Sequence, residues 1–542
     1  MQGQMMDMPL LISQLLKHAD RYHGDTEIVS RLVNGDIHRY TYRDAHRRTR
    51  QFANALRKLG VTPGQRLGTL AWNTHRHFEA YFGIAGIGAI SHTINPRLFP
   101  EQIAYIINHA ENKLLFVDES FVPLVEQLAS QLPTVEKVII FTDKTDFETS
   151  LENWASYETL ISEESDQFEW PTFDEREASS LCYTSGTTGN PKGVLYSHRS
   201  TLIHTYTAAM PDALNVSARD VVMPVVPMFH VNAWGLPYIC SMVGAKLVFP
   251  GPAMDGKSLC DLALAESVTL SAGVPTIWAG VDAYLLDNKI KLPDLNRIII
   301  GGSACPSSMI RSFEVNHNIE VAHAWGMTEL SPLGTFNSFK AKHSELDNEA
   351  KLAFKENQGR VLFGIDMKIT DEAGEDLPWD GKTFGDLLVR GPNVLTNYYK
   401  QTDPLLIEDQ EQNGWFMTGD VATINPDGYM QITDRSKDVI KSGGEWISSI
   451  DIENAAVSHP EIIEAGVIAI PHPKWDERPL LVVVKKADSH ITKEAILEFF
   501  IGKIAKWWIP DDVVFVDEIP HTATGKILKT KLREDFANYQ AE

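Results

Sequence analysis

Short apolar runs alternate with amphipathic segments along most of the chain. The runs at 114–117, 138–141 and 297–300 are rich in Leu, Val and Ile and have polar neighbours. Continuous apolar runs of this length are typical of strands that are buried on both faces of a sheet. Helical patterns, such as the one at 103–109, lie between such runs. This alternation predicts an α/β fold made of layered sheets and helices.

The character of the chain changes at a short charged connector, whose sequence is Asp434-Arg435-Ser436-Lys437-Asp438. A helical pattern at 449–459, β-like runs at 467–470 and 480–484, and a helical pattern at 493–500 follow it. These elements are enough for a small α+β domain. We therefore predict a large multi-layer N-terminal domain at 1–433, a hinge linker at 434–439 and a small C-terminal domain at 440–542. The acidic segment 143–176 has no clear periodicity, and we expect an irregular surface excursion there.

Composition narrows the range of functions. The chain has 542 residues and a formal net charge of -23, with 49 Lys+Arg against 72 Asp+Glu. Binding nucleic acid over a broad surface needs clustered positive charge, so we expect no nucleic-acid partner. The 4 cysteines form no CxxC pair, which argues against a zinc site or disulfides and suits a cytoplasmic protein. No run reaches the ~18 apolar residues that a membrane span needs, so we expect no transmembrane segment.

The segment 183–193, YTSGTTGNPKG, is the strongest local indication of chemistry. Its glycines let backbone N–H groups approach an anion, its four hydroxyl residues add donors, and Lys192 adds positive charge. Together these features suit a polyphosphate, although a polar surface loop is the plain alternative. A P-loop kinase or NTPase is excluded, because the P-loop motif needs a hydroxyl residue directly after the lysine and Gly193 stands there.

The same segment resembles the phosphate signature of the adenylate-forming superfamily, which includes acyl-CoA synthetases, luciferases and adenylation domains. Three further signatures of that superfamily follow in its order: AWGMTE at 324–329, WFMTGD at 415–420 and PHTATGK at 520–526. The stretches 95–102, 226–234 and 441–449 are most similar to fatty-acyl-CoA synthetases and 3-methylmercaptopropionyl-CoA ligases. The resemblance covers nearly the whole chain and implies the two-domain adenylate-forming fold.

The resemblance implies an AMP-forming acid–CoA ligase. Such an enzyme activates a carboxylic acid with ATP, giving acyl-AMP and pyrophosphate, and then gives acyl-CoA and AMP with CoA. It implies Mg²⁺ as the metal, ATP and CoA as co-substrates, and a homodimer. A medium- or long-chain fatty acid is the favoured substrate, and 3-methylmercaptopropionate, a short thioether acid of sulfur-compound catabolism, is the alternative. We expect neither an adenylation domain nor a luciferase, because no carrier domain follows Lys526 and nothing encodes an oxidation step.

The resemblance also assigns the ATP site. Lys526 would contact the α-phosphate and the carboxylate, His230 would lie where these groups meet, and Glu329 completes the catalytic set. Thr184 and Glu329 would hold Mg²⁺, since the reaction joins two anions and needs positive charge. The remaining ATP-binding residues are Ser185, Gly186, Thr187, Thr188, Gly189, Lys192, Gly302, Ser303, His323, Ala324, Trp325, Thr328, Asp420, Arg435, Lys437 and Lys441.

The acyl and CoA sites are assigned in the same way. Trp234 would gate the acyl tunnel, and Lys437 would be the hinge residue about which the small domain turns between the two half-reactions. Cys305 is not expected to be a nucleophile, because AMP and then CoA carry the acyl group. The residues assigned to these sites are Val231, Trp234, Gly302, Cys305, Gly443, Gly444 and Trp446.

Overall fold

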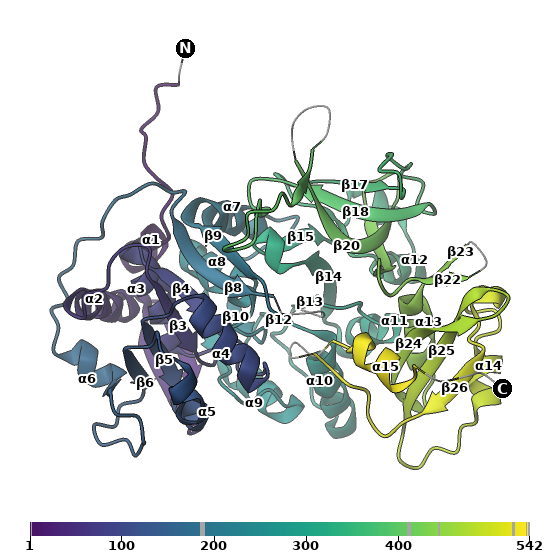
Figure 1. The fold of residues 1–542 in the computed structure, drawn as a ribbon, viewed down its shortest axis with the longest axis horizontal. Coiled ribbons are helices and arrows are strands. Elements are labelled where there is room, and N and C mark those ends of the chain that lie inside the picture. The colour runs from purple at the N-terminus through teal and green to yellow at the C-terminus, as the bar shows by residue number, and fades with distance from the viewer. Residues whose placement is uncertain are drawn as a thin grey trace.

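The computed structural model describes residues 1, 3–184, 190–408, 414–442, 445–522, 526–537 and 539. Its strands form two large, mostly parallel sheets and two smaller, mostly antiparallel ones (Figure 1). Helices pack against the large sheets and against the last of the small ones (Figure 1). This layered arrangement confirms the predicted α/β class.

The first large sheet has the strand order β7-β6-β5-β3-β4-β8-β9 and is parallel except for the β8–β9 pair. All five residues of β5 are buried, which explains why that segment is a continuous apolar run. The bounds are β3 Arg66–Leu70, β4 Ile90–Thr93, β5 Leu114–Asp118, β6 Lys137–Phe141, β7 Trp154–Ser156, β8 Ala178–Tyr183 and β9 Gly193–Ser197.

The second large sheet has the order β16-β15-β14-β13-β12-β10-β11-β1-β2 and is parallel from β14 to β1. Its strand β13 is the apolar run predicted at 297–300, and the three isoleucines of that run are fully buried. The bounds are β1 Glu27–Arg31, β2 Ile37–Thr41, β10 Val221–Pro224, β11 Lys246–Phe249, β12 Leu270–Gly273, β13 Arg297–Ile300, β14 Glu320–Gly326, β15 Leu333–Phe336 and β16 Arg360–Val361.

The helices of this part begin and end where local chemistry favours it. The helix α2 starts with a capping box, in which Asp44 N donates to Thr41 Oγ1 at 3.3 Å and Thr41 N donates to Asp44 Oδ2 at 3.2 Å. The α-helices are α1 Ile12–His23, α2 Tyr42–Lys58, α3 His75–Gly86, α4 Pro100–His109, α5 Val122–Leu128, α6 Tyr157–Ser162, α7 His198–Ala209, α8 Leu236–Val243, α9 Gly256–Glu266, α10 Pro275–Asn288, α11 Ser307–Arg311 and α12 Asn348–Phe354. Shorter helical turns are η1 Glu119–Phe121, η2 Ala129–Gln131, η3 Val231–Gly235, η4 Ser312–His317, η5 Thr328–Leu330 and η6 Ala341–Glu345. Within the described part of the chain, no helix has the length and apolar character to cross a membrane.

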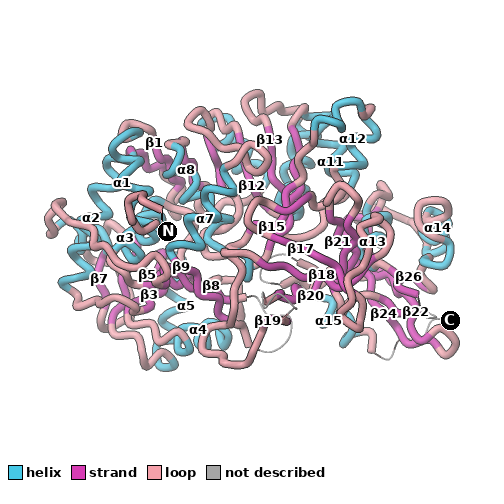
Figure 2. The backbone as a smooth tube through the Cα atoms, turned by 90° about the horizontal axis from the view of Figure 1, so that it is seen from above, coloured by secondary structure: helices cyan, strands magenta, loops and turns pink. Residues whose placement is uncertain are grey.

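Two smaller sheets complete the fold. The third sheet contains β17 Asp366–Thr370, β18 Phe384–Arg390, β19 Leu406–Ile407, β20 Trp415–Ile424 and β21 Met430–Arg435. The fourth contains β22 Ile440–Ser442, β23 Glu445–Ile447, β24 Ile462–His472, β25 Asp476–Lys485 and β26 Asp512–Phe515, with α13 Ser449–Val457, α14 Lys493–Phe499, η7 Lys506–Trp508 and α15 Lys529–Asp535 beside it. The fourth sheet lies at one end of the molecule (Figure 2). The chain passes from the third sheet to the fourth between Arg435 and Ile440.

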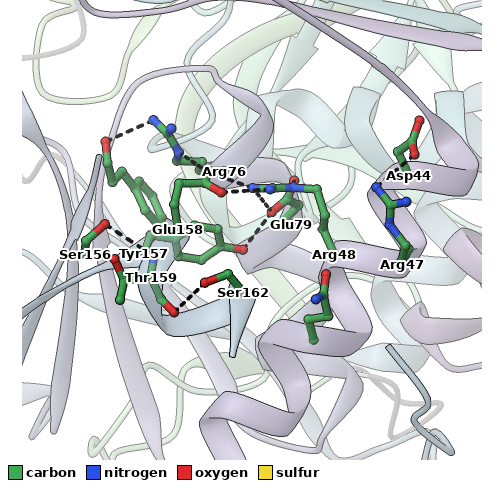
Figure 3. Close-up of polar contacts among 12 residues, drawn as sticks. Asp44, Arg47, Arg48, Arg76, Glu79, Ser156, Tyr157, Glu158, Thr159 and Ser162 are labelled. Carbon is green, nitrogen blue, oxygen red and sulfur yellow. Dashed lines mark hydrogen bonds and ion pairs between the residues drawn. The ribbon is translucent and has the colours of Figure 1, made fainter. Parts of the chain in front are cut away.

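The acidic segment 143–176 is more regular than its sequence suggests, because β7 and α6 lie within it. Glu158 on α6 reaches two arginines of neighbouring helices (Figure 3). Its carboxylate binds Arg48 Nη1 and Nη2, both at 2.8 Å, and Arg76 Nε at 2.8 Å. These ion pairs fasten α6 to α2 and α3.

A second carboxylate closes the same cluster. Glu79 of α3 is fully buried and binds Arg48 Nε at 2.7 Å. The hydroxyl of Tyr157 donates to Glu79 Oε2 at 2.8 Å (Figure 3). Burial raises the pKa of Glu79, and Arg48 opposes that rise. The cluster therefore places two acids and two arginines in a largely dry site, where each charge has a partner.

Candidate active site

Two glycines directly after β13 let neighbouring chain segments approach closely. A Cβ atom on Gly301 would lie 2.8 Å from the carbonyl oxygen of Ala324 and 3.3 Å from Cη2 of Trp234. Gly302 has a φ of +85°, which side chains of L-residues rarely allow. The fold thus brings Gly302, Ala324 and Trp234 together at the carboxyl end of β13.

A buried carboxylate on β20 lies next to an indole. Trp325 Nε1 donates to Asp420 Oδ2 at 2.9 Å, and both residues are buried. Arg435 Nε lies 2.8 Å from Asp420 Oδ1, because β20 and β21 pair at these two residues. The carboxylate is therefore held in a fixed position from two sides, and its lone pairs are not all used.

Glu329 lies on η5, a turn that follows β14. Its carboxylate is buried and accepts a hydrogen bond from the Tyr398 hydroxyl at 2.8 Å. Burial raises the pKa of Glu329, and the hydrogen bond from Tyr398 opposes that rise. The ammonium of Lys192 lies 4.8 Å from the centre of the same tyrosine ring. Tyr398 thus joins Glu329 to Lys192; it has no motif of its own, so sequence reasoning missed it.

Lys526 comes from the small domain and reaches the same region. Its backbone bonds to Thr522: Thr522 N donates to Lys526 O at 2.7 Å, and Lys526 N donates to Thr522 Oγ1 at 3.1 Å. Burial lowers the pKa of Lys526 to about 8; Arg435 acts in the same direction, and Asp420 and Glu329 oppose it. These charges lie close enough to affect one another, so the fold gathers Lys526, Glu329, Asp420 and Arg435.

His230 faces this cluster from the large domain. Burial lowers its pKa to about 3, and the positive charge of Lys526 contributes. The imidazole is therefore neutral at physiological pH and can donate or accept hydrogen bonds without adding charge.

The turn after His230 is left-handed. Val231, Asn232, Ala233 and Trp234 have φ between 47° and 54°, and the glycine that follows has a φ of 80°. Left-handed backbone costs on the order of 1–3 kcal/mol for a residue with a side chain, so surrounding contacts must hold it. Asn232 supplies two of them: its Nδ2 donates to the Ser180 hydroxyl at 3.0 Å, and its Oδ1 accepts from the Cys182 thiol at 3.4 Å. This turn directs the Trp234 side chain onto Gly301.

The two ends of the predicted phosphate loop lie side by side. Thr184 N donates to Lys192 O at 2.8 Å, and Lys192 N donates to Thr184 Oγ1 at 3.2 Å. The predicted residues that lie outside the described part of the chain are Ser185, Gly186, Thr187, Thr188, Gly189, Gly443 and Gly444.

Four other predicted residues lie on β14, on η5 and in the segment after β13. His323 is buried on β14, and burial lowers its pKa to about 4. The carbonyl of Thr328 accepts a hydrogen bond from the Tyr196 hydroxyl at 2.5 Å. Ser303 is exposed, whereas Cys305 is buried and burial raises the pKa of its thiol. A buried, protonated thiol is a poor nucleophile, which agrees with the role predicted for Cys305.

Three predicted residues lie where the third and fourth sheets meet. Lys437 is exposed in the turn between β21 and β22. Lys441 Nζ binds Glu372 Oε1 at 3.0 Å, and the Trp446 ring stacks on Phe384 with 5.8 Å between ring centres. Glu372 and Phe384 belong to the large domain, so these contacts hold the small domain against it.

Few of the described side chains near this cluster are suited to binding a metal. In the residues that the structure describes, no three His, Cys, Asp or Glu side chains gather in a way that could hold an ion. Mg²⁺ bound to a nucleotide needs fewer protein ligands, because it takes one or two carboxylates together with phosphates and waters. The buried carboxylate of Glu329, with a hydroxyl as its hydrogen-bond partner, fits that requirement.

Comparison with known families gives two matches. The sequence model of the AMP-binding enzyme family matches residues 15–399. The model of the AMP-binding enzyme C-terminal domain matches residues 451–526.

Several curated proteins are similar over nearly their whole length. The chain is 54% identical to a 3-methylmercaptopropionyl-CoA ligase of Ruegeria lacuscaerulensis, over 99% of each chain. It is 50% identical to a medium-chain-fatty-acid–CoA ligase of Ectopseudomonas oleovorans, over 99% of this chain and 98% of that one. It is 45% identical to a long-chain-fatty-acid–CoA ligase of Thermus thermophilus, over 99% and 97%. Among solved structures, the anthranilate CoA ligase AuaEII in complex with anthranoyl-AMP has the same fold, with a TM-score of 0.85, 24% identity and 98% coverage of each chain.

Proposed function

This chain belongs to the AMP-binding enzyme family, and on that premise we propose that it is an acid–CoA ligase that works through an acyl-adenylate. The observation that carries the proposal is the position of Lys526. Its ammonium comes from the small domain and interacts electrostatically with Glu329, Asp420 and Arg435. A partly buried cation beside acidic groups suits a reaction that must bring two anions together.

In the first half-reaction, a carboxylate oxygen of the acid attacks the α-phosphorus of ATP. The bond between that phosphorus and the oxygen bridging to the β-phosphate breaks, and pyrophosphate leaves with the electron pair. We propose that Lys526, a cation below pH 8, neutralises the carboxylate and the α-phosphate as they meet. The neutral His230 donates a hydrogen bond at the same place without competing for that charge.

The nucleotide would be held mainly by the large domain. We propose that Asp420 accepts hydrogen bonds from the ribose hydroxyls, since Trp325 and Arg435 already fix its position. The phosphates would lie at the loop 184–192, next to Lys192. Glu329 and Thr184 are the proposed ligands of Mg²⁺, which would supply positive charge at the phosphates when bound.

In the second half-reaction, the CoA thiolate attacks the acyl carbon, and AMP leaves as the new thioester forms. We propose that the chain divides at a 434–439 hinge. When the small domain turns about Lys437, the face that carries Lys526 leaves the active site and another face of the small domain takes its place. The sheet change between Arg435 and Ile440 supports this division. Lys441, Gly443, Gly444 and Trp446 are then the candidates for contacts with CoA.

The proposed substrate is a medium- or long-chain fatty acid. Trp234 lies against Gly301 at the end of β13, and we propose that its indole opens or closes an acyl channel there. The alternative substrate is 3-methylmercaptopropionate, and the 54% identity to a 3-methylmercaptopropionyl-CoA ligase favours it. Each additional buried methylene contributes only about 0.8 kcal/mol, so a fatty-acid pocket would prefer one range of chain lengths without excluding its neighbours.

The test is CoA-thioester formation with ATP and Mg²⁺ across acids from acetate to palmitate, with 3-methylmercaptopropionate included. A maximum at medium or long chains supports the fatty acid. A maximum at the thioether acid, with palmitate inactive, supports the alternative and means that Trp234 closes the pocket. Absence of thioester with every acid would contradict the ligase itself.

We also propose a homodimer in the cytoplasm. The resemblance to fatty-acyl-CoA synthetases supports the dimer, and the four cysteines without a CxxC pair support a reducing compartment. Sedimentation velocity of the purified protein tests the dimer, since a mass near 60.6 kDa at micromolar concentration would contradict it.

A further inference from the structure

A chain of buried polar groups links the helix after Lys526 to the large domain. Lys529 Nζ lies 2.8 Å from Glu453 Oε1 and donates to the hydroxyl of Ser449. That hydroxyl donates in turn to Asp434 Oδ2 at 2.6 Å, and Ser449 N donates to the same oxygen at 2.7 Å. Lys529 and Ser449 belong to the small domain, whereas Asp434 lies on β21 of the third sheet, at the start of the proposed hinge.

These groups have little access to water. The side chains of Lys529, Glu453 and Asp434 are 11%, 14% and about 1% exposed. Burial opposes the charge on Lys529, but Glu453 and Asp434 outweigh it, so the pKa of Lys529 lies above its ordinary value. A lysine so deeply buried is rare unless its charge is paired. Here the ammonium of Lys529 has both Glu453 and Ser449 as partners.

The chain of groups lies close to Lys526 along the backbone. Lys529 begins α15, only three residues after Lys526. Between these two lysines, Leu528 N donates to Pro520 O at 2.7 Å. The helix α15 lies on the side of the small domain that faces the large one (Figure 1). Lys529 is therefore separated from Lys526 by only two residues, one of which has a backbone hydrogen bond to Pro520.

The far end of the chain also reaches the candidate site. Asp434 precedes Arg435, which binds Asp420. One end of the polar chain thus leads to Asp420, which would hold the ribose. The other end leads to Lys526, which would hold the α-phosphate.

We propose that Lys529 is a positioning residue, which holds Lys526 at the reacting atoms by way of Ser449 and Asp434. The proposal rests on the proposed adenylate-forming function and adds a residue to it that has no contact with substrate. A displacement of about 1 Å at a reacting group can cost on the order of 10²-fold in rate, so losing this anchor should affect turnover more than binding.

The test compares Lys529→Met, Ser449→Ala and the double variant with the wild-type chain, by acid-dependent exchange of pyrophosphate into ATP and by melting temperature. Lys531→Met is the matched control, because Lys531 lies on the same helix, is exposed and pairs with Asp535. We expect Lys529→Met to lower kcat by about 10²-fold while KM for ATP changes much less. The double variant should lose little more than Lys529→Met, because both changes break one chain of bonds. Lys529→Arg, which keeps charge and donors, should recover most of the activity.

A melting temperature that falls while kcat stays normal would make Lys529 a structural residue and overturn the inference. Equal losses from Lys529→Met and Lys531→Met would overturn it as well. If Lys529→Met does not fold, Ser449→Ala decides alone, since it removes the link without leaving a charge unpaired; normal kcat there overturns the inference. A wild-type chain that shows no exchange with any acid would instead contradict the proposed function.

Discussion

Among single residues, Lys526 has the most important role in the proposed adenylate formation. Replacing it by alanine removes a cation that interacts with Glu329 and Asp420. Loss of a transition-state charge partner costs on the order of 10²–10³ in rate, and we expect Lys526→Ala to lose at least that in adenylate formation. The measurement is pyrophosphate exchange, with circular dichroism to verify the fold. Near-normal exchange in a folded variant would remove Lys526 from its proposed role.

The pKa of Lys526 predicts the alkaline side of the pH profile. The ammonium is charged below pH 8 and is lost as pH rises through about 8, so kcat/KM for the acid should fall about tenfold per pH unit above that value. Any residual activity of Lys526→Arg should lack this decline, because guanidinium stays charged. An unchanged alkaline limb in Lys526→Arg would assign the decline to another group.

Sequence motifs predict the charged residues of the candidate site, but not the residues that hold them. Lys526, Glu329 and Asp420 each belong to a motif with a recognisable order of residue types. Tyr398 and Lys529 are single polar residues outside the motifs, and only the fold brings them to Glu329 and to Ser449. Asn232 lies in the turn itself, but its partner Ser180 is distant in sequence. Long-range contacts of this kind leave no local pattern.

At the scale of elements, buried ion pairs should hold α6 in place. Removing one member of a buried charge cluster typically costs about 3–5 kcal/mol, because its partners stay buried without compensation. We therefore expect Glu79→Ala to lower the free energy of unfolding by that amount in urea denaturation. Arg47→Ala is the control: its pair with Asp44 is largely exposed and should contribute about 0–1 kcal/mol (Figure 3). Similar losses from the two variants would contradict the importance of burial here.

Some elements could be predicted from the sequence, whereas others, such as the helix held by this cluster, could not. Strands such as β5 and β13 are continuous apolar runs, so their burial on both faces can be predicted from composition. The helix α6 has only six residues and lies in an acidic segment, so its pattern is too short to predict. Its position depends on Arg48 and Arg76, which are 110 and 82 residues away in sequence. The left-handed turn at 231–235 was missed for a similar reason, since its residues are mostly not glycine.

At the scale of the whole molecule, the small domain contributes Lys526 to a site that the large domain otherwise builds. Proline at position 437 fixes one backbone dihedral in the proposed hinge. We expect Lys437→Pro to keep adenylate formation and to slow thioester formation by at least tenfold, measured with acyl-adenylate supplied in advance. Lys437→Ala separates the backbone effect from loss of the side chain, and its thioester rate should exceed that of the proline variant. Equal loss of both half-reactions in Lys437→Pro would argue against a hinge there.

In the proposed function, a single chain makes an acyl-adenylate before CoA takes part. Exchange of labelled pyrophosphate into ATP, with acid and Mg²⁺ present and CoA left out, measures that step directly. We predict that the wild-type chain exchanges pyrophosphate into ATP only when the acid is present, and that this exchange disappears in Lys526→Ala. Thioester formation without any such exchange, or with ADP and phosphate as products, would contradict it.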